Sequence, residues 1–333
     1  MSFSRKVHHL VMLAAIGTQI VKAKLLMRRI PIVVSIHVTN KCNLRCKYCY
    51  ANVDGRFDAP KEEFSTADLK RYITEMQRLG TRWIVLLGGE PLLRKDIKEI
   101  IRHVKRSGML CELVTNGTLI ETNIQEIEDV DLLCISIDGD MESNDAARGN
   151  GSFTRALKGL EVATKHVINT RIHAVFTRYN VNARDLRCLA SLAARFKTTF
   201  GFSNPITPHG DGREQSNYIV NANELKPFLQ LVKRYKLKNM PVYNSIAALN
   251  FASSDPPKNL SKRRQTMQRD LVFKHTTCHA GDRFCYVDSE GFVYPCIECG
   301  VKAGLNIKEV GFKKAFDYLP AVKCHGCNHI QYF

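Results

Sequence analysis

Short runs of apolar and β-branched residues alternate along the chain with stretches of helical periodicity. The runs predict six strands, at 32–38, 83–87, 109–115, 132–137, 171–177 and 198–202. One helix between them has readable ends, because Ser65 and Asp68 can form a capping box and Gly80 can end the helix. Strands joined by such helices predict an α/β fold with parallel pairing, a partial (β/α)6 barrel whose site lies at the carboxyl ends of the strands.

The amino-terminal segment 1–31 is predicted to be a basic amphipathic helix. Only residues 10–21 lack charge, which is shorter than the roughly 20 residues that a membrane-spanning helix needs. Its apolar positions share one helical face and are Leu10, Leu13, Ile16, Ile20 and Val21. A helix lying on a membrane surface and a helix packed on the main domain fit this pattern equally well.

The rest of the chain divides into three predicted parts. The barrel occupies 32–205, a helical insert or linker follows at 206–274, and the segment 275–333 carries six of the twelve cysteines. A segment of that length is too short to hold a core unaided, so we expect a small module held together by metal.

The net charge and the spacing of the cysteines limit the kinds of partner and of cellular compartment that we expect. Lys and Arg total 49 against 32 Asp and Glu, a net charge of +17, so the surface should attract anions. The basic residues are scattered and no aromatic-rich RNA-binding motif accompanies them, which argues against nucleic acid as the partner. Closely spaced cysteines in a chain of this size favour metal ligation in a reducing compartment, hence a cytoplasmic protein.

Three cysteines follow the first predicted strand, at Cys42, Cys46 and Cys49. Thiolates at these spacings can wrap one iron–sulfur cluster. Because the cube of a four-iron cluster has four iron atoms and this loop offers three ligands, one iron would stay open to a small molecule.

This spacing resembles the signature of the radical S-adenosylmethionine (radical SAM) superfamily, in which an aromatic residue, here Tyr48, precedes the third cysteine. The resemblance implies a [4Fe-4S] cluster on the three cysteines, with S-adenosylmethionine (SAM) bound to the open iron and Tyr48 near its adenine. Further strand ends resemble family positions that contact the methionine amino group, the ribose and the carboxylate. Their residues are Gly88, Gly89, Glu90, Asn116, Ser136, Asp138 and, for the carboxylate, Arg148.

The carboxyl-terminal cysteines resemble a Twitch module, a shortened SPASM domain that holds an auxiliary [4Fe-4S] cluster. Its ligands would be Cys278, Cys296, Cys324 and Cys327, beside a hairpin that turns at 288–291. A zinc ribbon is the alternative, because Cys296 and Cys299 can pair with Cys324 and Cys327.

The resemblance implies an enzyme that cleaves SAM reductively to a 5′-deoxyadenosyl radical, which takes hydrogen from an unactivated C–H bond. We expect a small or amphiphilic substrate, including phosphorylated ones, net oxidation or bond formation assisted by the auxiliary cluster, and an electron donor such as flavodoxin or ferredoxin. No acid or base is assigned. The alternatives are a peptide-modifying radical SAM/SPASM maturase and, from another class, a non-catalytic zinc protein that binds nucleic acid.

Overall fold

One curved sheet organises the molecule. The computed structural model describes residues 3–49, 62–205, 218, 220, 222–253, 279–297 and 304–322. Its eight strands follow the order β6-β5-β4-β3-β2-β1-β7-β8, and every pair is parallel except β7–β8. The strands are β1 (Val33–His37), β2 (Trp83–Leu87), β3 (Leu110–Thr115), β4 (Leu132–Ser136), β5 (Thr170–Val175), β6 (Thr199–Ser203), β7 (Phe284–Val287) and β8 (Val293–Tyr294).

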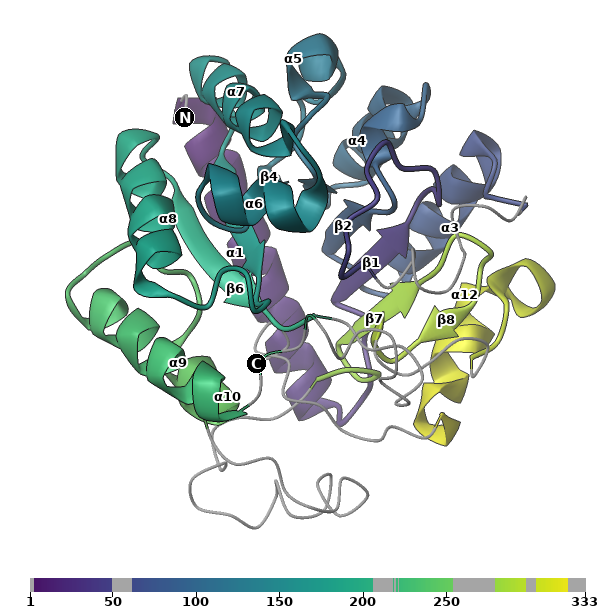
Figure 1. Ribbon diagram of the computed structural model, residues 1–333. Helices are drawn as coiled ribbons and strands as arrows, with labels where there is room; N and C mark the ends of the chain where they lie inside the picture. The colour runs from purple at the N-terminus through teal and green to yellow at the C-terminus, as the bar shows by residue number, and fades with distance from the viewer. Residues whose placement is uncertain are drawn as a thin grey trace.

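Helices surround the outer face of this sheet (Figure 1). The α-helices are α1 (Phe3–Leu25), α3 (Thr66–Arg78), α4 (Ile97–Arg106), α5 (Ile120–Asn123), α6 (Met141–Arg148), α7 (Ser152–Lys165), α8 (Ala183–Arg195), α9 (Ala222–Leu237), α10 (Ile246–Ser253) and α12 (Ile307–Tyr318). Short 3₁₀ helices are η1 (Pro91–Leu93), η2 (Ile124–Glu126) and η6 (Leu319–Ala321). The chain thus has an α/β fold with a parallel sheet.

The core lies between the sheet and the helices. On β2, Ile84 and Leu86 point to the helices and are fully buried, whereas the alternate positions, such as Val85, point to the concave side and are partly exposed. The apolar stripe of α4, which includes Ile100 and Val104, packs into the same core. The concave side is therefore left to a mixture of polar and apolar side chains.

The six strands expected from the sequence are present, each within two residues of its predicted bounds. The capping box is confirmed as well, because Ser65 Oγ accepts a hydrogen bond from the Asp68 amide at 3.1 Å. Gly80, at the end of the same helical segment, has a φ of +107°. The helices α6 and α12 were not anticipated.

The carboxyl-terminal hairpin continues the barrel sheet, because β7 pairs in parallel with β1. Its turn is organised by Asp288, whose Oδ1 accepts hydrogen bonds from the amides of Glu290, Gly291 and Phe292 at 2.9 to 3.0 Å. The expected hairpin is thus observed. The division of the chain at residue 275 stays a prediction.

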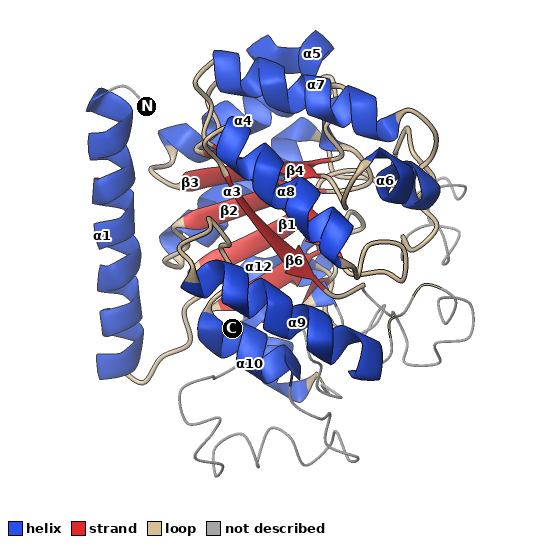
Figure 2. Cartoon of the chain, turned by 60° about the vertical axis from the view of Figure 1, so that its left-hand side comes forward, coloured by secondary structure: helices blue, strands red, loops and turns tan. Residues whose placement is uncertain are grey.

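Helix α1 crosses the end of the barrel where the strands begin (Figure 2). Ala23 on its inner face packs with Ile30 and Ile32, just before β1. The Arg29 guanidinium then donates to the carbonyls of Gly281 (Nε, 3.0 Å) and Phe316 (Nη2, 2.8 Å). These contacts hold the amino-terminal segment against the barrel. None of the helices in the described parts of the chain is long and apolar enough to cross a bilayer.

Replacing Ser65 by Ala removes the side-chain acceptor at the start of α3. We expect the free energy of unfolding, measured by urea titration, to fall by about 1 kcal/mol. The control is Ser107→Ala, because Ser107 Oγ donates to the His103 carbonyl and caps no free amide. That variant should change stability by less than about 0.5 kcal/mol, and equal effects of the two variants would contradict the cap assignment.

Candidate active site at the carboxyl ends of the strands

The loop after β1 presents Cys42, Cys46 and Cys49, all partly exposed and outside any disulfide. The thiols are close enough to influence one another electrostatically. Burial raises the pKa of Cys46 to about 12, against the opposing charge of Arg148, and both other thiols act in the same direction as burial. Burial also raises the pKa of Cys42. The loop therefore favours neutral thiols until a positive charge, such as that of bound iron, is supplied.

The donor set fits an iron–sulfur cluster better than a single ion. Within the described ranges, no three His, Cys, Asp or Glu side chains gather around one ion-sized position. A four-iron cube is wider than an ion, and three thiols on one loop match a cluster held by three protein ligands.

Gly88 and Gly89 let the end of β2 press against the start of the cysteine loop. A Cβ on Gly88 would lie 2.6 Å from the Thr39 carbonyl oxygen, and one on Gly89 would lie 2.3 Å from the Lys41 carbonyl oxygen. The Gly89 amide donates to the Thr39 carbonyl at 2.7 Å. The close approach that these glycines allow is thus to the protein's own loop, and their contact with SAM stays a prediction.

Glu90 joins the end of β2 to the end of β3, and its amide donates to the Lys41 carbonyl at the start of the cysteine loop at 2.7 Å. Its side chain is fully buried; Oε1 accepts from the Leu92 amide (3.1 Å) and Thr115 Oγ1 (2.8 Å), and Oε2 accepts from the Asn116 amide (2.8 Å). Burial raises the pKa of Glu90 to about 7, although these three hydrogen bonds oppose the shift. Because Oε2 receives one hydrogen bond, it keeps a lone pair for a further donor.

A buried ion pair lies beside Cys46, whose thiol both charges influence. Asp138, at the end of β4, accepts from Arg148 through Nε (2.7 Å) and Nη2 (3.0 Å), and Tyr48 Oη donates to the same carboxylate at 2.7 Å. The Arg148 guanidinium also lies 5.5 Å from the centre of the Tyr48 ring. The attraction of Asp138 raises the pKa of Arg148 despite its burial, so Arg148 stays charged. Three residues predicted to contact SAM are thus bound to one another, and Nη1 is the guanidinium nitrogen outside this pair.

Asn116 connects the end of β3 to the cysteine loop, because its Nδ2 donates to Asn43 Oδ1 at 2.8 Å. Its Oδ1 accepts from Thr118, both from the amide and from the hydroxyl. Ser136 is partly exposed at the end of β4, opposite His173 in the sheet register. The structure therefore brings Asn116 to the loop and leaves Ser136 facing the barrel interior.

A polar group inside the barrel was missed by sequence reasoning. His173 on β5 forms hydrogen bonds with Tyr243 Oη and, at 2.8 Å, with Ser203 Oγ at the end of β6. Arg171 stacks over the Tyr243 ring at 4.4 Å. Burial lowers the pKa of His173 to about 4, so the ring is neutral at pH 7. Alternation along β5 places Arg171 and His173 on one face, but no local pattern marks Tyr243 as their partner.

Most of the predicted auxiliary site lies outside the described residues, namely Cys278, Cys324 and Cys327. Cys296, which follows β8, is buried. Cys285 on β7 is fully buried, and that burial raises the pKa of its thiol. The auxiliary cluster and the zinc alternative both stay predictions.

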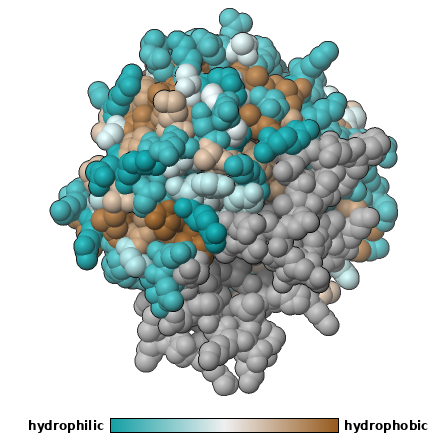
Figure 3. Space-filling model, in the orientation of Figure 1, coloured by the Kyte–Doolittle hydropathy of each residue, from teal (hydrophilic) through white to brown (hydrophobic). Residues whose placement is uncertain are grey.

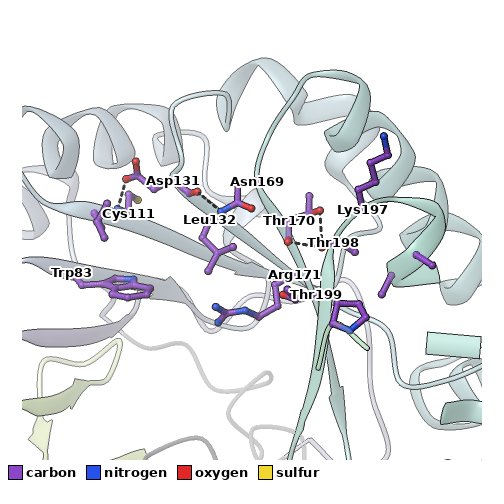
Figure 4. A pocket seen from close by; sticks show the side chains of 14 residues that line it. Trp83, Cys111, Asp131, Leu132, Asn169, Thr170, Arg171, Lys197, Thr198 and Thr199 are labelled. Atoms are coloured by element: carbon purple, nitrogen blue, oxygen red, sulfur yellow. Dashed lines mark hydrogen bonds between the residues drawn. The ribbon is translucent and has the colours of Figure 1, made fainter. Parts of the chain in front are cut away.

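A cavity of about 550 Å³ lies at the opposite end of the barrel, where β2 to β6 begin (Figure 4). Trp83, Leu132 and Arg171 line it from the first two residues of their strands, and Lys197 lines it from the loop between α8 and β6. In barrels of this kind the amino ends of the strands serve stability, whereas reactive groups gather at the carboxyl ends. The cysteine loop, not this cavity, is therefore the candidate site.

Comparisons with known proteins match the barrel part of the chain to one superfamily. Residues 36–187, which include the cysteine loop and Arg148, match the model of the radical SAM superfamily. The chain is 29% identical over 307 residues to the AdoMet-dependent heme synthase of Methanosarcina barkeri, across 87% of this chain and 83% of that protein. It is 28% identical over 319 residues to mycofactocin maturase MftC of Mycolicibacterium smegmatis, across 90% and 76%.

The fold also matches solved structures. The crystal structure of Streptococcus suis SuiB bound to S-adenosylmethionine superposes with a TM-score of 0.66 at 19% identity, over 91% of this chain and 68% of that one.

Gly89→Ala should displace the cysteine loop, because the new Cβ would meet a backbone carbonyl that cannot turn away. We expect the free energy of unfolding to fall by about 1–3 kcal/mol. The control is Gly17→Ala in α1, where nothing lies within 4 Å of the new Cβ, and this variant should be neutral or stabilising by up to about 1 kcal/mol. If Gly89→Ala proved as harmless as the control, the close approach would be refuted.

Asp138→Ala should leave the Arg148 charge buried without its partner. We expect a loss of about 3–5 kcal/mol in urea unfolding at pH 7. The matched control is Asp317→Ala, which breaks the exposed ion pair of Asp317 with Lys313 and should cost less than about 0.5 kcal/mol. A small loss in both variants would contradict the strength assigned to the buried pair.

Proposed function

Residues 36–187 form a radical SAM domain and the chain is an enzyme; from this premise we propose that Cys42, Cys46 and Cys49 hold a [4Fe-4S] cluster with SAM at its open iron. When bound, the cluster supplies the electron that cleaves SAM to methionine and a 5′-deoxyadenosyl radical. The observation that carries this proposal is the cysteine loop itself, held at the carboxyl ends of β1 to β4 by polar contacts.

The chain's own residues would position SAM and exclude water. Arg148 Nη1 offers a charge-assisted donor to the methionine carboxylate, while Asp138 keeps the guanidinium oriented. The open lone pair on Glu90 Oε2 suits the methionine amino group. Tyr48, Gly88, Gly89, Asn116 and Ser136 complete the proposed SAM contacts.

The barrel interior is the proposed place of the substrate. His173, Tyr243 and Ser203 offer neutral hydrogen-bonding groups next to the SAM contacts, and the charges of Asp138 and Arg148 both influence the pKa of His173. Holding an unactivated C–H bond in one position is the protein's main task, because a primary carbon radical attacks whatever it reaches. Net oxidation or bond formation would follow, assisted by an auxiliary [4Fe-4S] cluster on Cys278, Cys296, Cys324 and Cys327.

The relatives support two substrate classes. A small or amphiphilic substrate agrees with the heme synthase alignment, and the basic surface agrees with phosphate on that substrate. A peptide substrate is the second candidate, favoured by the alignment with mycofactocin maturase over 90% of this chain. The non-catalytic zinc protein is set aside, because the relatives are enzymes.

The net positive charge of the chain bears on which protein supplies the electron. We propose a cytoplasmic setting with an acidic one-electron donor such as flavodoxin or ferredoxin, whose approach the net charge of +17 would favour.

Anaerobic incubation with dithionite and SAM should release 5′-deoxyadenosine, measured by liquid chromatography. Cys42→Ala should abolish this release, because it removes one of the three ligands. The control is Cys111→Ala, which changes a cysteine near the start of β3, at the opposite end of the barrel, and should leave the release unchanged. Turnover in Cys42→Ala equal to wild type would refute the ligand assignment.

Iron and sulfide counts on the same sample test the auxiliary site. About eight irons per chain supports two four-iron clusters, and about four irons with one zinc supports the zinc ribbon.

A further inference from the structure

Helix α1 is apolar on two faces, and only one of them is covered. Ile16 and Ala23 on the inner face pack against the segment before β1. The opposite face carries Leu10, Val21 and Leu25, which are 66%, 55% and 78% exposed. Large apolar side chains that are this exposed along one helical stripe mark a site of interaction with a membrane or with another protein.

The exposed stripe is continuous. Helical positions 10, 14, 17, 21 and 25 lie above one another and hold Leu, Ala, Gly, Val and Leu. Thr18 borders the stripe, and its hydroxyl donates to the Ala14 carbonyl at 2.9 Å, so its polar group is satisfied within the helix. Val11 adds a further apolar side chain that is 55% exposed. The outer face of α1 thus presents no unsatisfied polar side chain along this stripe.

Positive charge borders the stripe on both sides. Successive residues turn by about 100° around a helix, so Lys22 follows Val21 on one flank and Lys24 precedes Leu25 on the other. Both lysines and the nearby Arg28 are exposed, and the 23 residues of α1 include no Asp or Glu. An apolar stripe between cations is complementary to a lipid surface that carries negative headgroups.

We propose that α1 binds the surface of an anionic phospholipid bilayer, with Leu10, Val21 and Leu25 in the acyl boundary and Lys22 and Lys24 at the headgroups. A second copy of the chain fits less well, because a symmetric contact between two such helices would bring the lysines of both together. The helix lies on the membrane and does not cross it.

This contact would fix the direction in which the active site opens. Figure 2 shows α1 at the end where the strands begin, with α6 and the strand carboxyl ends on the far side. In Figure 3, which looks onto the carboxyl ends, the described residues of this face mix hydrophilic side chains with apolar areas. The mouth therefore opens away from the bilayer. This step rests on the proposed function, and it favours a substrate taken from water over one embedded in the membrane.

Flotation with lipid vesicles tests the contact. The full chain should float with vesicles of equal phosphatidylglycerol and phosphatidylcholine, and binding should fall at least tenfold with phosphatidylcholine alone. The double variant Val21→Asp with Leu25→Asp should reduce binding to the anionic vesicles at least tenfold. Lys22→Gln with Lys24→Gln should lower it on anionic vesicles only. Met141→Asp is the control, because Met141 is 55% exposed on α6, at the other end of the barrel, and this variant should bind as wild type does.

Circular dichroism should show equal helix content in all variants. A loss of binding can then be attributed to the changed surface of α1 and not to unfolding. The proposal fails if the wild-type chain does not float with anionic vesicles, or if the Val21 and Leu25 variant floats equally well. It also fails if that variant instead converts a dimer to a monomer in sedimentation. None of these results depends on the release of 5′-deoxyadenosine, so a failure here is distinct from a failure of the proposed reaction.

Brominated lipids test the orientation, because they quench only those tryptophans that reach the acyl region. A tryptophan introduced as Leu25→Trp should be quenched, and one introduced as Met141→Trp should not. Quenching at position 141 would overturn the inferred direction of the mouth.

Discussion

A charge is costly to bury without a partner, and this constraint sets the geometry around the cysteine loop. Asp138 and Arg148 are both buried, one at the end of β4 and the other at the end of α6, so each holds the other in place. Their pairing fixes α6 over the mouth of the barrel. The Ala147 carbonyl next to Arg148 then accepts from the Lys47 amide at 2.9 Å, and Tyr48 donates to Asp138. This ion pair is therefore the first support of the cysteine loop.

Glu90 gives the loop its second support. Its buried carboxylate collects donors from the ends of two strands, and the glycines before it bring β2 against the loop backbone. The residues that the family resemblance linked to SAM thus also build the frame of the site. We propose that Arg148 and Glu90 hold the site with some of their polar atoms and offer the remaining ones to SAM.

The sequence predicted those parts of the structure that depend on residues close together in the chain. Strand periodicity placed the six strands expected from the sequence, and the capping pair at Ser65 located the start of α3. Cysteine spacing pointed to the candidate site, which stays a prediction. Contacts between distant segments left no such signal. Tyr243 lies 70 residues from His173, in a stretch without clear periodicity, so their hydrogen bond could not be foreseen. The pattern of α1 did not choose between core and surface because both of its faces are apolar.

The account requires an iron on the cysteine loop that is open to SAM. Hyperfine spectroscopy on the anaerobically reduced protein, mixed with SAM labelled with oxygen-17 in its methionine carboxylate, tests this requirement directly. The account predicts a changed cluster signal with coupling to the label. An unchanged signal without coupling would show a cluster closed to SAM and would contradict it.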